Sequence, residues 1–255
     1  MKRLLSIFCF LISLSLFAQN ANAQIAQASQ SKMNSQNAQT DQASQTETSA
    51  RSLVDEAVKK SSISETIDFL SKKIETLSNP ADVRSLASFL ASLHEQLFHF
   101  DEARKLYVKA AGIRAGDAQG FPKKSSESLV LDAVRCALST GDASIANSYL
   151  NSAVRNSADE TIQATIKLYE VWSRLCLAEN ENDLHEVIVL LDAYSSLPSM
   201  QSVKPSVLLT LWYLTSKKKY ADALSHDFPN SLETGIVQGK VKMLPAPFWF
   251  FLPRK

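Results

Sequence analysis

Glycine and proline are scarce in this chain, which holds 6 glycines and 8 prolines in 255 residues. Folds with many tight turns, such as β-sandwiches and α/β barrels, use these two residues at turns that other residues adopt with difficulty. Their scarcity favours long helices joined by short loops, and the 45% of hydrophobic residues can form a sizeable core. The sequence therefore predicts an all-α protein.

Positive and negative charges nearly cancel, with 27 Lys and Arg against 26 Asp and Glu. Domains that bind nucleic acid concentrate basic residues on one face and are usually basic overall. This chain has no such excess, so we expect no nucleic-acid partner.

The first 23 residues have the order of a secretory signal. Lys2 and Arg3 precede an apolar run over residues 4–17, and Ala-Asn-Ala at 21–23 supplies a small-x-small cleavage site. The apolar run is shorter than the roughly 20 residues that cross a bilayer as a helix. We therefore predict cleavage after Ala23, no transmembrane segment beyond it, and export to the bacterial periplasm or cell envelope. An uncleaved N-terminal anchor is the alternative.

Residues 24–50 are polar and contain no glycine, proline or aromatic residue. Glutamine recurs at every third position through most of this stretch, which is not the 3.6-residue period of an α-helix. Such a tract cannot bury enough apolar area to offset the entropy lost on ordering. We expect a disordered Gln/Ser-rich linker, with a partner-binding polar segment as the alternative.

The clearest repeated pattern runs from Asp82 to Ala111 and predicts two antiparallel helices. Leucines recur on one face of the first half beside two alanines, and the second half carries a small–bulky–small series. These residues are Leu86, Leu90, Leu93, Leu97, Ala87 and Ala91, followed by Ala103, Tyr107 and Ala110. Two helices can approach closely where alanine faces alanine, and the aromatic ring then fills the space beside them.

This unit resembles a tetratricopeptide repeat (TPR) in the small residue of its first helix (Ala91), the aromatic at the turn (Phe100) and the series that begins at Ala103. It departs from the family at Ala87 and His94, where aromatic residues are favoured. The resemblance implies a stack of helical hairpins that binds protein partners in a concave groove.

Weaker copies of the pattern extend the resemblance over residues 51–230. The equivalent second-helix positions are 66, 103, 146, 187 and 223. Every interval between them exceeds the family period of 34 residues, and the longest contains the loop from Gly112 to Ser126. The resemblance implies a right-handed α-solenoid of about four to five antiparallel hairpins, followed by a non-repeat cap over residues 231–255. An irregular helical bundle is the alternative.

The resemblance also implies that the first helix of each hairpin lines the groove and leaves one polar stripe exposed. Residues spaced three and four apart form such stripes. The candidate binding residues are Ser88, Ser92, Glu95, Asp132, Arg135, Lys167, Glu170, Arg174 and Tyr213. The same stripes include Ser85, Ser128, Ser139, Gln163, Ser206, Thr210 and Lys217, and a first stripe joins Arg51, Asp55 and Lys59. Trp172 and Trp212 lie off the stripes and are expected in the core.

Arg135 and Arg174 occupy equivalent places in neighbouring units, with Lys167 nearby. Converging cations can bind the carboxylate of a peptide or of an acidic side chain. The alternative is that the charges pair along their own helices, Asp132 with Arg135 and Glu170 with Arg174.

Four consecutive aromatic residues stand near the end of the chain, framed by prolines. They are Phe248, Trp249, Phe250 and Phe251. Proline resists helix formation, so we expect an extended segment there. It can cover the open apolar face of the last hairpin, and contact with a partner or a membrane surface is the alternative.

Two cysteines, Cys136 and Cys176, lie in apolar helical segments of the predicted repeat region. A disulfide formed in an oxidising compartment and two buried free thiols are both compatible with this placement.

No motif for catalysis, metal binding or cofactor binding is present. The 4 histidines have no metal-ligand spacing, and no nucleophile elbow, phosphate loop or dinucleotide fingerprint occurs. We expect no enzyme, no cofactor and no metal. Two functions remain: a scaffold of the cell envelope that binds proteins or peptides in its groove, or a periplasmic component of a transport system that holds a small molecule or cell-wall fragment. An open groove favours the first, and a pocket lined by polar stripes and aromatic residues favours the second.

Overall fold

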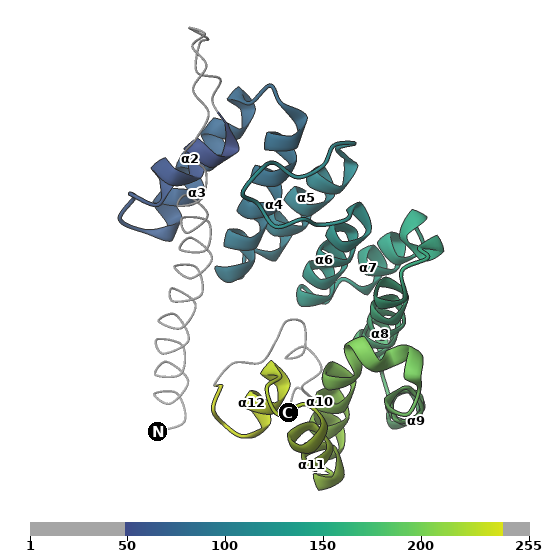
Figure 1. Cartoon of the computed structure of the whole chain (residues 1–255). Coiled ribbons are helices and arrows are strands. Elements are labelled where there is room, and N and C mark those ends of the chain that lie inside the picture. Colours follow the sequence, from purple (N-terminus) through teal and green to yellow (C-terminus); the bar gives the residue numbers. More distant parts are fainter. Residues whose placement is uncertain (1–48, 242–255) are drawn as a thin grey trace, which may run out of the picture. The chain divides into compact units, whose positions relative to one another are not determined.

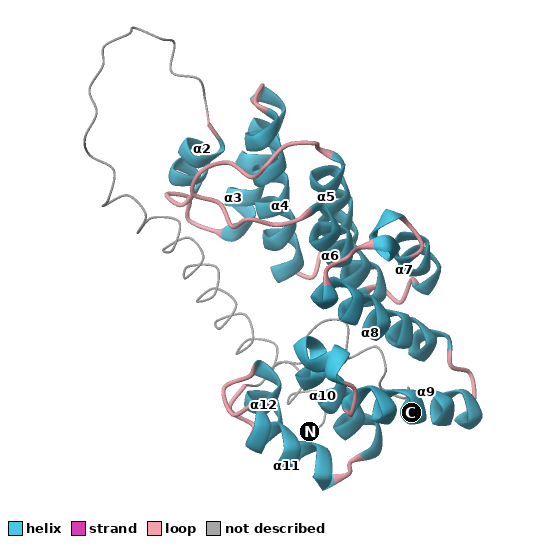
Figure 2. Cartoon of the chain, turned by 45° about the vertical axis from the view of Figure 1, so that its right-hand side comes forward, coloured by secondary structure: helices cyan, strands magenta, loops and turns pink. Residues whose placement is uncertain are grey.

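The structure, a computed structural model, describes residues 49–241 of the chain. Within that range it contains eleven α-helices, α2 to α12, and no strand, as Figures 1 and 2 show. The predicted all-α fold is therefore confirmed for these residues. The predicted signal peptide, almost all of the predicted linker and the four C-terminal aromatic residues lie outside the described range.

The chain divides into two compact units, residues 1–129 and residues 130–255. Unit 1 contains helices α2 to α5, and unit 2 contains helices α7 to α12. Helix α6 (Ser126–Ser139) begins in unit 1 and ends in unit 2.

Unit 1 is built from two successive helix pairs. Its elements are α2 (Ala50–Ala57), α3 (Ile63–Lys73), the 3-10 turn η2 (Ile74–Thr76), α4 (Pro80–Gln96) and α5 (Phe100–Gly112). Ser49 caps α2 through reciprocal hydrogen bonds with Ser52. Asn79 caps α4 directly before Pro80, which stands where its missing N–H needs no partner.

Small residues line the contact between α4 and α5. Ala87, Ala91, Ala103 and Ala110 are completely buried. Tyr107, which stands between the two alanines of α5, is 1% exposed. This burial is the pattern that the small–bulky–small series predicts.

Unit 2 holds the remaining helices and two further 3-10 turns. They are α7 (Ala143–Leu150), η3 (Ala153–Asn156), α8 (Glu160–Leu177), α9 (Glu181–Ser195), η4 (Pro198–Val203), α10 (Lys204–Thr215), α11 (Lys218–Asp227) and α12 (Leu232–Val237). The side chains of Asp142, Asp159, Asn180 and Ser231 accept hydrogen bonds from first-turn amides. These caps set the residues at which α7, α8, α9 and α12 begin.

Short turns account for the long spacing of the repeat pattern. The turns η2, η3 and η4 add residues between successive helices, and residues 113–125 form a long loop after α5. Met200 of η4 is completely buried, so this turn contributes to the core. Each interval of the expected pattern therefore contains an additional local element or loop.

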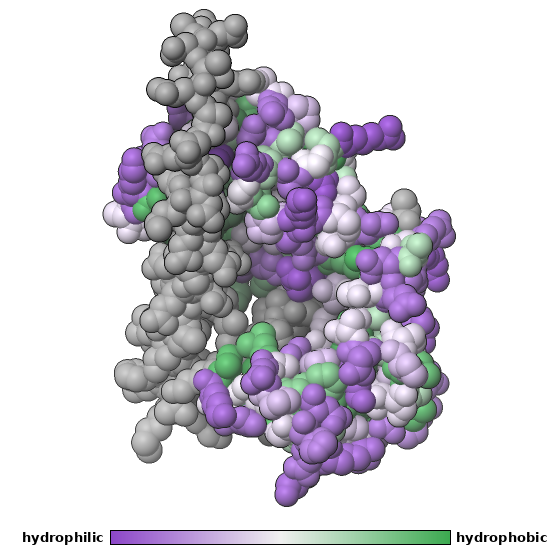
Figure 3. All heavy atoms as spheres, viewed as in Figure 1, coloured by the Kyte–Doolittle hydropathy of each residue, from purple (hydrophilic) through white to green (hydrophobic). Residues whose placement is uncertain are grey.

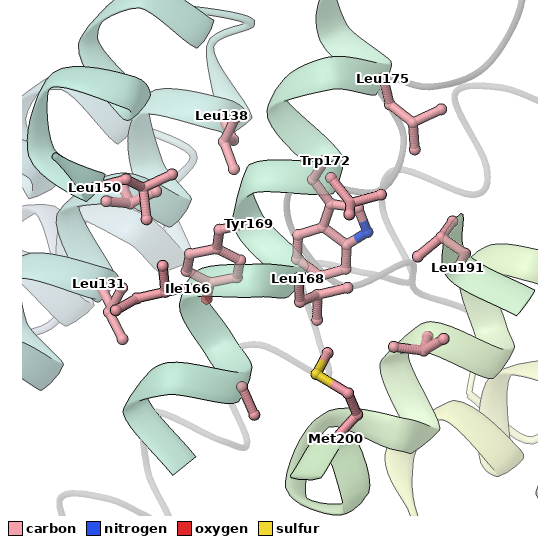
Figure 4. Close-up of a cluster of buried hydrophobic side chains, with 14 of the residues drawn as sticks. Leu131, Leu138, Leu150, Ile166, Leu168, Tyr169, Trp172, Leu175, Leu191 and Met200 are labelled. Atoms are coloured by element: carbon pink, nitrogen blue, oxygen red, sulfur yellow. The ribbon is translucent and has the colours of Figure 1, made fainter. Parts of the chain in front are cut away.

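The core of unit 2 is organised around Trp172 of α8 (Figure 4). Trp172 is 5% exposed, and its ring stacks on Tyr169 with the centroids 5.4 Å apart. Its indole N–H donates to Thr210 Oγ1 at 3.1 Å. Trp172 therefore lies in the core as expected, whereas Trp212 is only partly buried against it.

Thr210 does not lie on an exposed stripe, so that prediction is wrong. The residue is completely buried. Its hydroxyl accepts the hydrogen bond from Trp172 and donates to the Ser206 carbonyl at 2.7 Å. The hydroxyl therefore both accepts and donates a hydrogen bond inside the protein, which explains how this polar residue is accommodated in the core.

On the face seen in Figure 3, the described surface is mostly hydrophilic with small hydrophobic areas between. The exposed large hydrophobic residues are Val58, Phe98, Val108, Leu177, Val189, Leu197 and Leu232. No helix within residues 49–241 combines the length and the apolar character that a membrane crossing requires.

Cys136 and Cys176 are not joined by a disulfide in this structure, so that alternative is not formed. Cys136 is completely buried. Burial raises the pKa of the half-buried Cys176 to about 11.

We expect Cys176 to react slowly with iodoacetamide at neutral pH, because the thiolate is the reactive form. A pKa of about 11 leaves roughly one thiol in ten thousand ionised at pH 7. Mapping of labelled peptides by mass spectrometry measures the rate, with urea-denatured protein as the control in which both thiols are accessible. Labelling of Cys176 in the folded protein as fast as in urea would contradict the expectation.

The imidazole of His94, near the end of α4, titrates abnormally. Burial lowers the pKa of His94 below its usual 6.5, the nearby His99 lowers it further, and Glu102 opposes both. The two imidazole rings are 5.7 Å apart between centroids.

The thermal stability of the protein is expected to fall as the pH drops below about 6.5, the ordinary pKa of histidine. Between that value and the lower folded-state pKa, the unfolded chain binds a proton at His94 and the folded chain does not. Calorimetric Tm values across this range measure the effect, and His94→Gln should flatten it. His226→Gln is the control because the His226 side chain is 88% exposed. An identical pH profile in His94→Gln and the original protein would show that another group is responsible.

Candidate functional site

A buried arginine of α4 holds the long loop that follows α5. The side chain of Arg84 is 3% exposed, and its Nε donates to Asp117 Oδ1 at 3.2 Å. Its terminal nitrogens donate to the carbonyls of Ala110 (2.8 Å), Ile113 (3.2 Å) and Lys124 (2.7 Å) and to the hydroxyl of Ser126 (3.3 Å). These acceptors stand on both sides of the loop over residues 113–125, so one guanidinium ties both of its ends to α4.

Two more hydrogen bonds fix the middle of the loop. Asp117 Oδ2 accepts from the Lys124 amide at 2.8 Å, and Ser85 Oγ accepts from the Ala118 amide at 2.7 Å. Figure 2 shows the loop in pink as it crosses α4 toward α2. Ser85 is 2% exposed, so its predicted place on an exposed stripe is wrong, because its hydroxyl anchors the loop instead.

The loop, α2 and α4 border a pocket of about 400 Å³, a size typical of ligand sites. The lining residues are Arg51 and Val54 of α2, Ser85, Ser88, Phe89 and Ser92 of α4, and Asp117, Gly120, Phe121, Pro122 and Lys124 of the loop. Ser88 and Ser92 were predicted as binding residues, and Arg51 belongs to the first predicted stripe. The pocket thus joins parts of two predicted stripes with residues of the loop.

One wall of the pocket is aromatic. The rings of Phe89 and Phe121 meet edge to face, with the centroids 6.3 Å apart and the planes at 79°. Ser92 Oγ donates to the Phe89 carbonyl at 2.7 Å within α4. The site therefore combines an apolar wall with serine hydroxyls, a mixture that can bind an apolar group and orient a polar one.

Two basic side chains, Arg51 and Lys124, also line the pocket. Arg51 Nε lies 3.4 Å from Asp55 Oδ1, and its Nη1 lies 3.5 Å from the Gly120 carbonyl. Lys124 Nζ lies 5.3 Å from the centre of the Tyr107 ring. The single carboxylate among the lining residues, Asp117, is paired with Arg84. The charge of the lining residues is therefore positive on balance.

Gly120 allows the loop to approach Arg51. Its φ of +85° lies in the left-handed region that favours glycine, and a Cβ at this position would be 3.1 Å from Arg51 Nη1. A second cavity, of about 650 Å³, shares Arg51, Asp117 and Gly120 with this pocket.

The other predicted binding residues do not line this pocket. Glu95 accepts a hydrogen bond from the Tyr107 hydroxyl at 3.0 Å. The remaining candidates, Asp132, Arg135, Lys167, Glu170, Arg174 and Tyr213, lie in unit 2. Asp132 and Arg135 form the ion pair predicted along α6, at 2.9 Å. Lys167 and Tyr213 are partly buried, and Ser139 is 1% exposed rather than on an open stripe.

Glu170 and Arg174 do not form the salt bridge that their spacing predicts. Glu170 instead pairs with Arg155 of η3 at 3.4 Å. Arg174 is exposed and borders a small cavity of about 220 Å³ together with Leu177, Asp183 and Glu186. The turn η3, which the helical pattern does not predict, supplies the competing cation.

The sequence reasoning missed Phe89, Phe121 and Lys124. The available signal was the concentration of glycines between Gly112 and Gly120, which marked an irregular insertion. The hydrogen bonds of Arg84 and Ser85 to the loop show that this insertion folds back over α4. Within residues 49–241, no three His, Cys, Asp or Glu side chains lie together so as to hold a metal ion.

Comparison with known proteins gives two partial matches. The family model described as TP_0752_M: middle domain matches residues 176–255. An uncharacterized protein of Treponema pallidum (strain Nichols) is 33% identical over 91 residues, which are 36% of this chain and 24% of that protein. No solved structure matches. The family match falls in unit 2, whereas the pocket lies in unit 1.

Proposed function

We propose that this chain is a non-enzymatic binding protein of the bacterial cell envelope that receives a segment of a partner protein in the pocket between α2, α4 and the loop over residues 113–125. The observation that carries the proposal is the composition of this pocket. Polar residues of one face of α4, aromatic rings and two basic side chains border one space of about 400 Å³. Ligand pockets are typically lined by apolar and aromatic side chains with a few polar groups that orient the ligand.

The hairpin of α4 and α5 supports a TPR-like interpretation of the scaffold. Its buried alanines and Tyr107 stand where the repeat pattern requires them. In such scaffolds the first helix of a hairpin carries the contact residues, and α4 supplies Ser88, Phe89 and Ser92 to the pocket. The location in the envelope rests on the signal-like N-terminal sequence.

Site-specific photocrosslinking tests the proposal. Replacement of Ser88 by p-benzoylphenylalanine places the crosslinker in the pocket, and the same replacement of the exposed Lys105 on α5 is the control. We expect the residue-88 variant to give discrete adducts in intact cells, identified by mass spectrometry as one partner segment. Adding Ser92→Phe, which fills the pocket, should abolish them. Equal adducts from both positions, or adducts that persist in Ser92→Phe, would contradict the proposal.

A small-molecule ligand is the second candidate, favoured by the edge-to-face pair of Phe89 and Phe121 inside a pocket of limited volume. In this case the protein is a binding component that holds a small molecule or cell-wall fragment for transport. Native mass spectrometry of protein purified from its own host distinguishes the two. A constant added mass that disappears in Ser92→Phe supports the small molecule.

A further inference from the structure

Two arginines stand at this pocket, and their hydrogen bonding differs. Arg84 uses all three of its nitrogens on five acceptors. Arg51 makes two contacts, at 3.4 Å and 3.5 Å, both at the long limit for a hydrogen bond. Arg84 therefore has a complete structural role, whereas the donors of Arg51 are largely unused.

The third nitrogen of Arg51 is buried and has no hydrogen-bond partner among residues 49–241. The Arg51 side chain as a whole is 19% exposed. A desolvated guanidinium donor without an acceptor is costly, and such atoms are rare in native proteins. Arg51 also lines the pocket, so its guanidinium group can contact an acceptor placed there.

The second cation, Lys124, is a loop residue whose main chain is held by two hydrogen bonds. Its carbonyl accepts from Arg84 at 2.7 Å, and its amide donates to Asp117 at 2.8 Å. The main chain of Lys124 thus holds the loop while its side chain lines the pocket. Asp117 has one carboxylate oxygen on Arg84 and the other on this amide.

The apolar residues of the pocket indicate which chemical group a bound anion carries. Val54, Phe89, Phe121 and Pro122 border the same space. A bare inorganic anion would leave these surfaces in contact with water. An anion that carries a ring or a branched apolar group would cover them and gain the corresponding hydrophobic free energy.

We propose that this pocket binds a carboxylate attached to an aromatic or other bulky apolar group, with Arg51 and Lys124 binding the carboxylate and Phe89 and Phe121 contacting the apolar group. A guanidinium group and a carboxylate can form two parallel hydrogen bonds in one plane. Both the free C-terminal residue of a peptide and a small apolar acid carry this chemistry. The inference rests on the proposed binding function and adds the chemical class of the bound group.

Matched probes test the charge requirement with the full chain. N-acetylphenylalanine carries the carboxylate, and N-acetylphenylalaninamide replaces it with a neutral group of the same shape. Isothermal titration and saturation-transfer NMR measure both affinities. We expect the acid to bind at least about tenfold more tightly than the amide, since hydrogen bonds to charged groups contribute about that much.

Variants then assign this preference to the two cations. Arg51→Gln and Lys124→Gln should each reduce the acid affinity about tenfold and leave the amide affinity nearly unchanged. Arg114→Gln is the control, because it removes the same charge from an exposed residue of the same loop that does not line the pocket. Thermal melting checks each fold, and Lys124→Gln keeps both main-chain anchors of the loop if Arg51→Gln proves unstable.

Longer probes identify the source of the acid. Acetyl-Ala-Ala-Phe should bind more tightly than N-acetylphenylalanine if the ligand is a peptide C-terminus, because its main chain can extend along the pocket. Equal affinities indicate a small apolar acid. Both results retain the carboxylate site.

Three results would overturn the inference. They are equal affinities of acid and amide, a preference for the acid that survives in both Arg51→Gln and Lys124→Gln, and no binding of either probe. Crosslinking through residue 88 distinguishes this failure from failure of the proposed function. If the adducts persist but the acid does not bind more tightly than the amide, the pocket still binds a partner but does not require a carboxylate.

Discussion

Replacing Arg84 by alanine is expected to lower the free energy of unfolding by about 3–5 kcal/mol, the usual cost of breaking a buried ion pair on one side. The side chains of Arg84 and Asp117 are 3% and 5% exposed. The alanine variant leaves a buried carboxylate without its cation and removes the hydrogen bonds to both ends of the loop. Urea denaturation followed by circular dichroism measures the loss.

A double variant separates the ion pair from the space that it fills. Arg84→Met with Asp117→Leu removes both charges, and buried pairs replaced in this way often cost little. We expect the double variant to be more stable than Arg84→Ala alone. Lys109→Ala is the control, because the Lys109–Glu75 pair is exposed, at 42% and 75%, and should contribute less than about 1 kcal/mol.

The loop itself supplies a second measurement on Arg84→Ala. Hydrogen exchange of the Ala118 and Lys124 amides should accelerate, because Arg84 holds Asp117, which accepts from Lys124, and holds the loop that brings Ala118 to Ser85. Arg84→Ala should also abolish binding of N-acetylphenylalanine, since residues 117–124 supply nearly half of the residues that line the pocket. Full stability with slow exchange at both amides would show that Arg84 does not hold the loop.

The helices of this protein could be predicted from the sequence because their signals are local. Ala103, Tyr107 and Ala110 are separated by four and three residues, so one face of one helix carries them all. The cap before α4 is equally local, with Asn79 and Pro80 adjacent in the chain. A window of about two helical turns contains each of these signals.

The pocket could not be predicted in the same way, because the contacts that form it connect distant residues. The acceptors of Arg84 lie 26 to 42 residues further along the chain. In the sequence Arg84 is one polar residue near the start of an amphipathic helix. The spacing does place Ser88 and Ser92 on one face, but it does not reveal that the insertion covers that face.

Hydroxyl residues caused the errors in the predicted stripes. Ser85 and Thr210 follow the spacing of an exposed face, yet both are buried. Each hydroxyl is satisfied inside the protein, Ser85 by the Ala118 amide and Thr210 by Trp172 and the Ser206 carbonyl. Periodicity separates polar from apolar residues, but it cannot distinguish a serine that faces water from one that binds a distant backbone group.

Trp172→Ala is expected to reduce the free energy of unfolding by about 3–5 kcal/mol, which is typical for loss of a large buried aromatic side chain. Trp172 lies in the centre of the unit 2 core with 5% exposure. Alanine leaves a cavity beside Tyr169 and removes the hydrogen bond to Thr210. Urea denaturation followed by far-ultraviolet circular dichroism measures the loss, with Val189→Ala as the control. Val189 is 55% exposed, and its truncation should change stability by less than about 0.5 kcal/mol.

Two milder variants divide the Trp172 effect into packing and hydrogen bonding. Trp172→Phe keeps most of the ring, and Thr210 Oγ1 still donates to the Ser206 carbonyl, so we expect a loss of only about 1–2 kcal/mol. Thr210→Val keeps the volume but leaves the indole N–H buried without an acceptor, which should cost about 1–3 kcal/mol. If packing dominates, Trp172→Ala is more destabilising than either. A Thr210→Val loss as large as that of Trp172→Ala would mean that this hydrogen bond, rather than the volume of the indole, determines the stability of the unit 2 core.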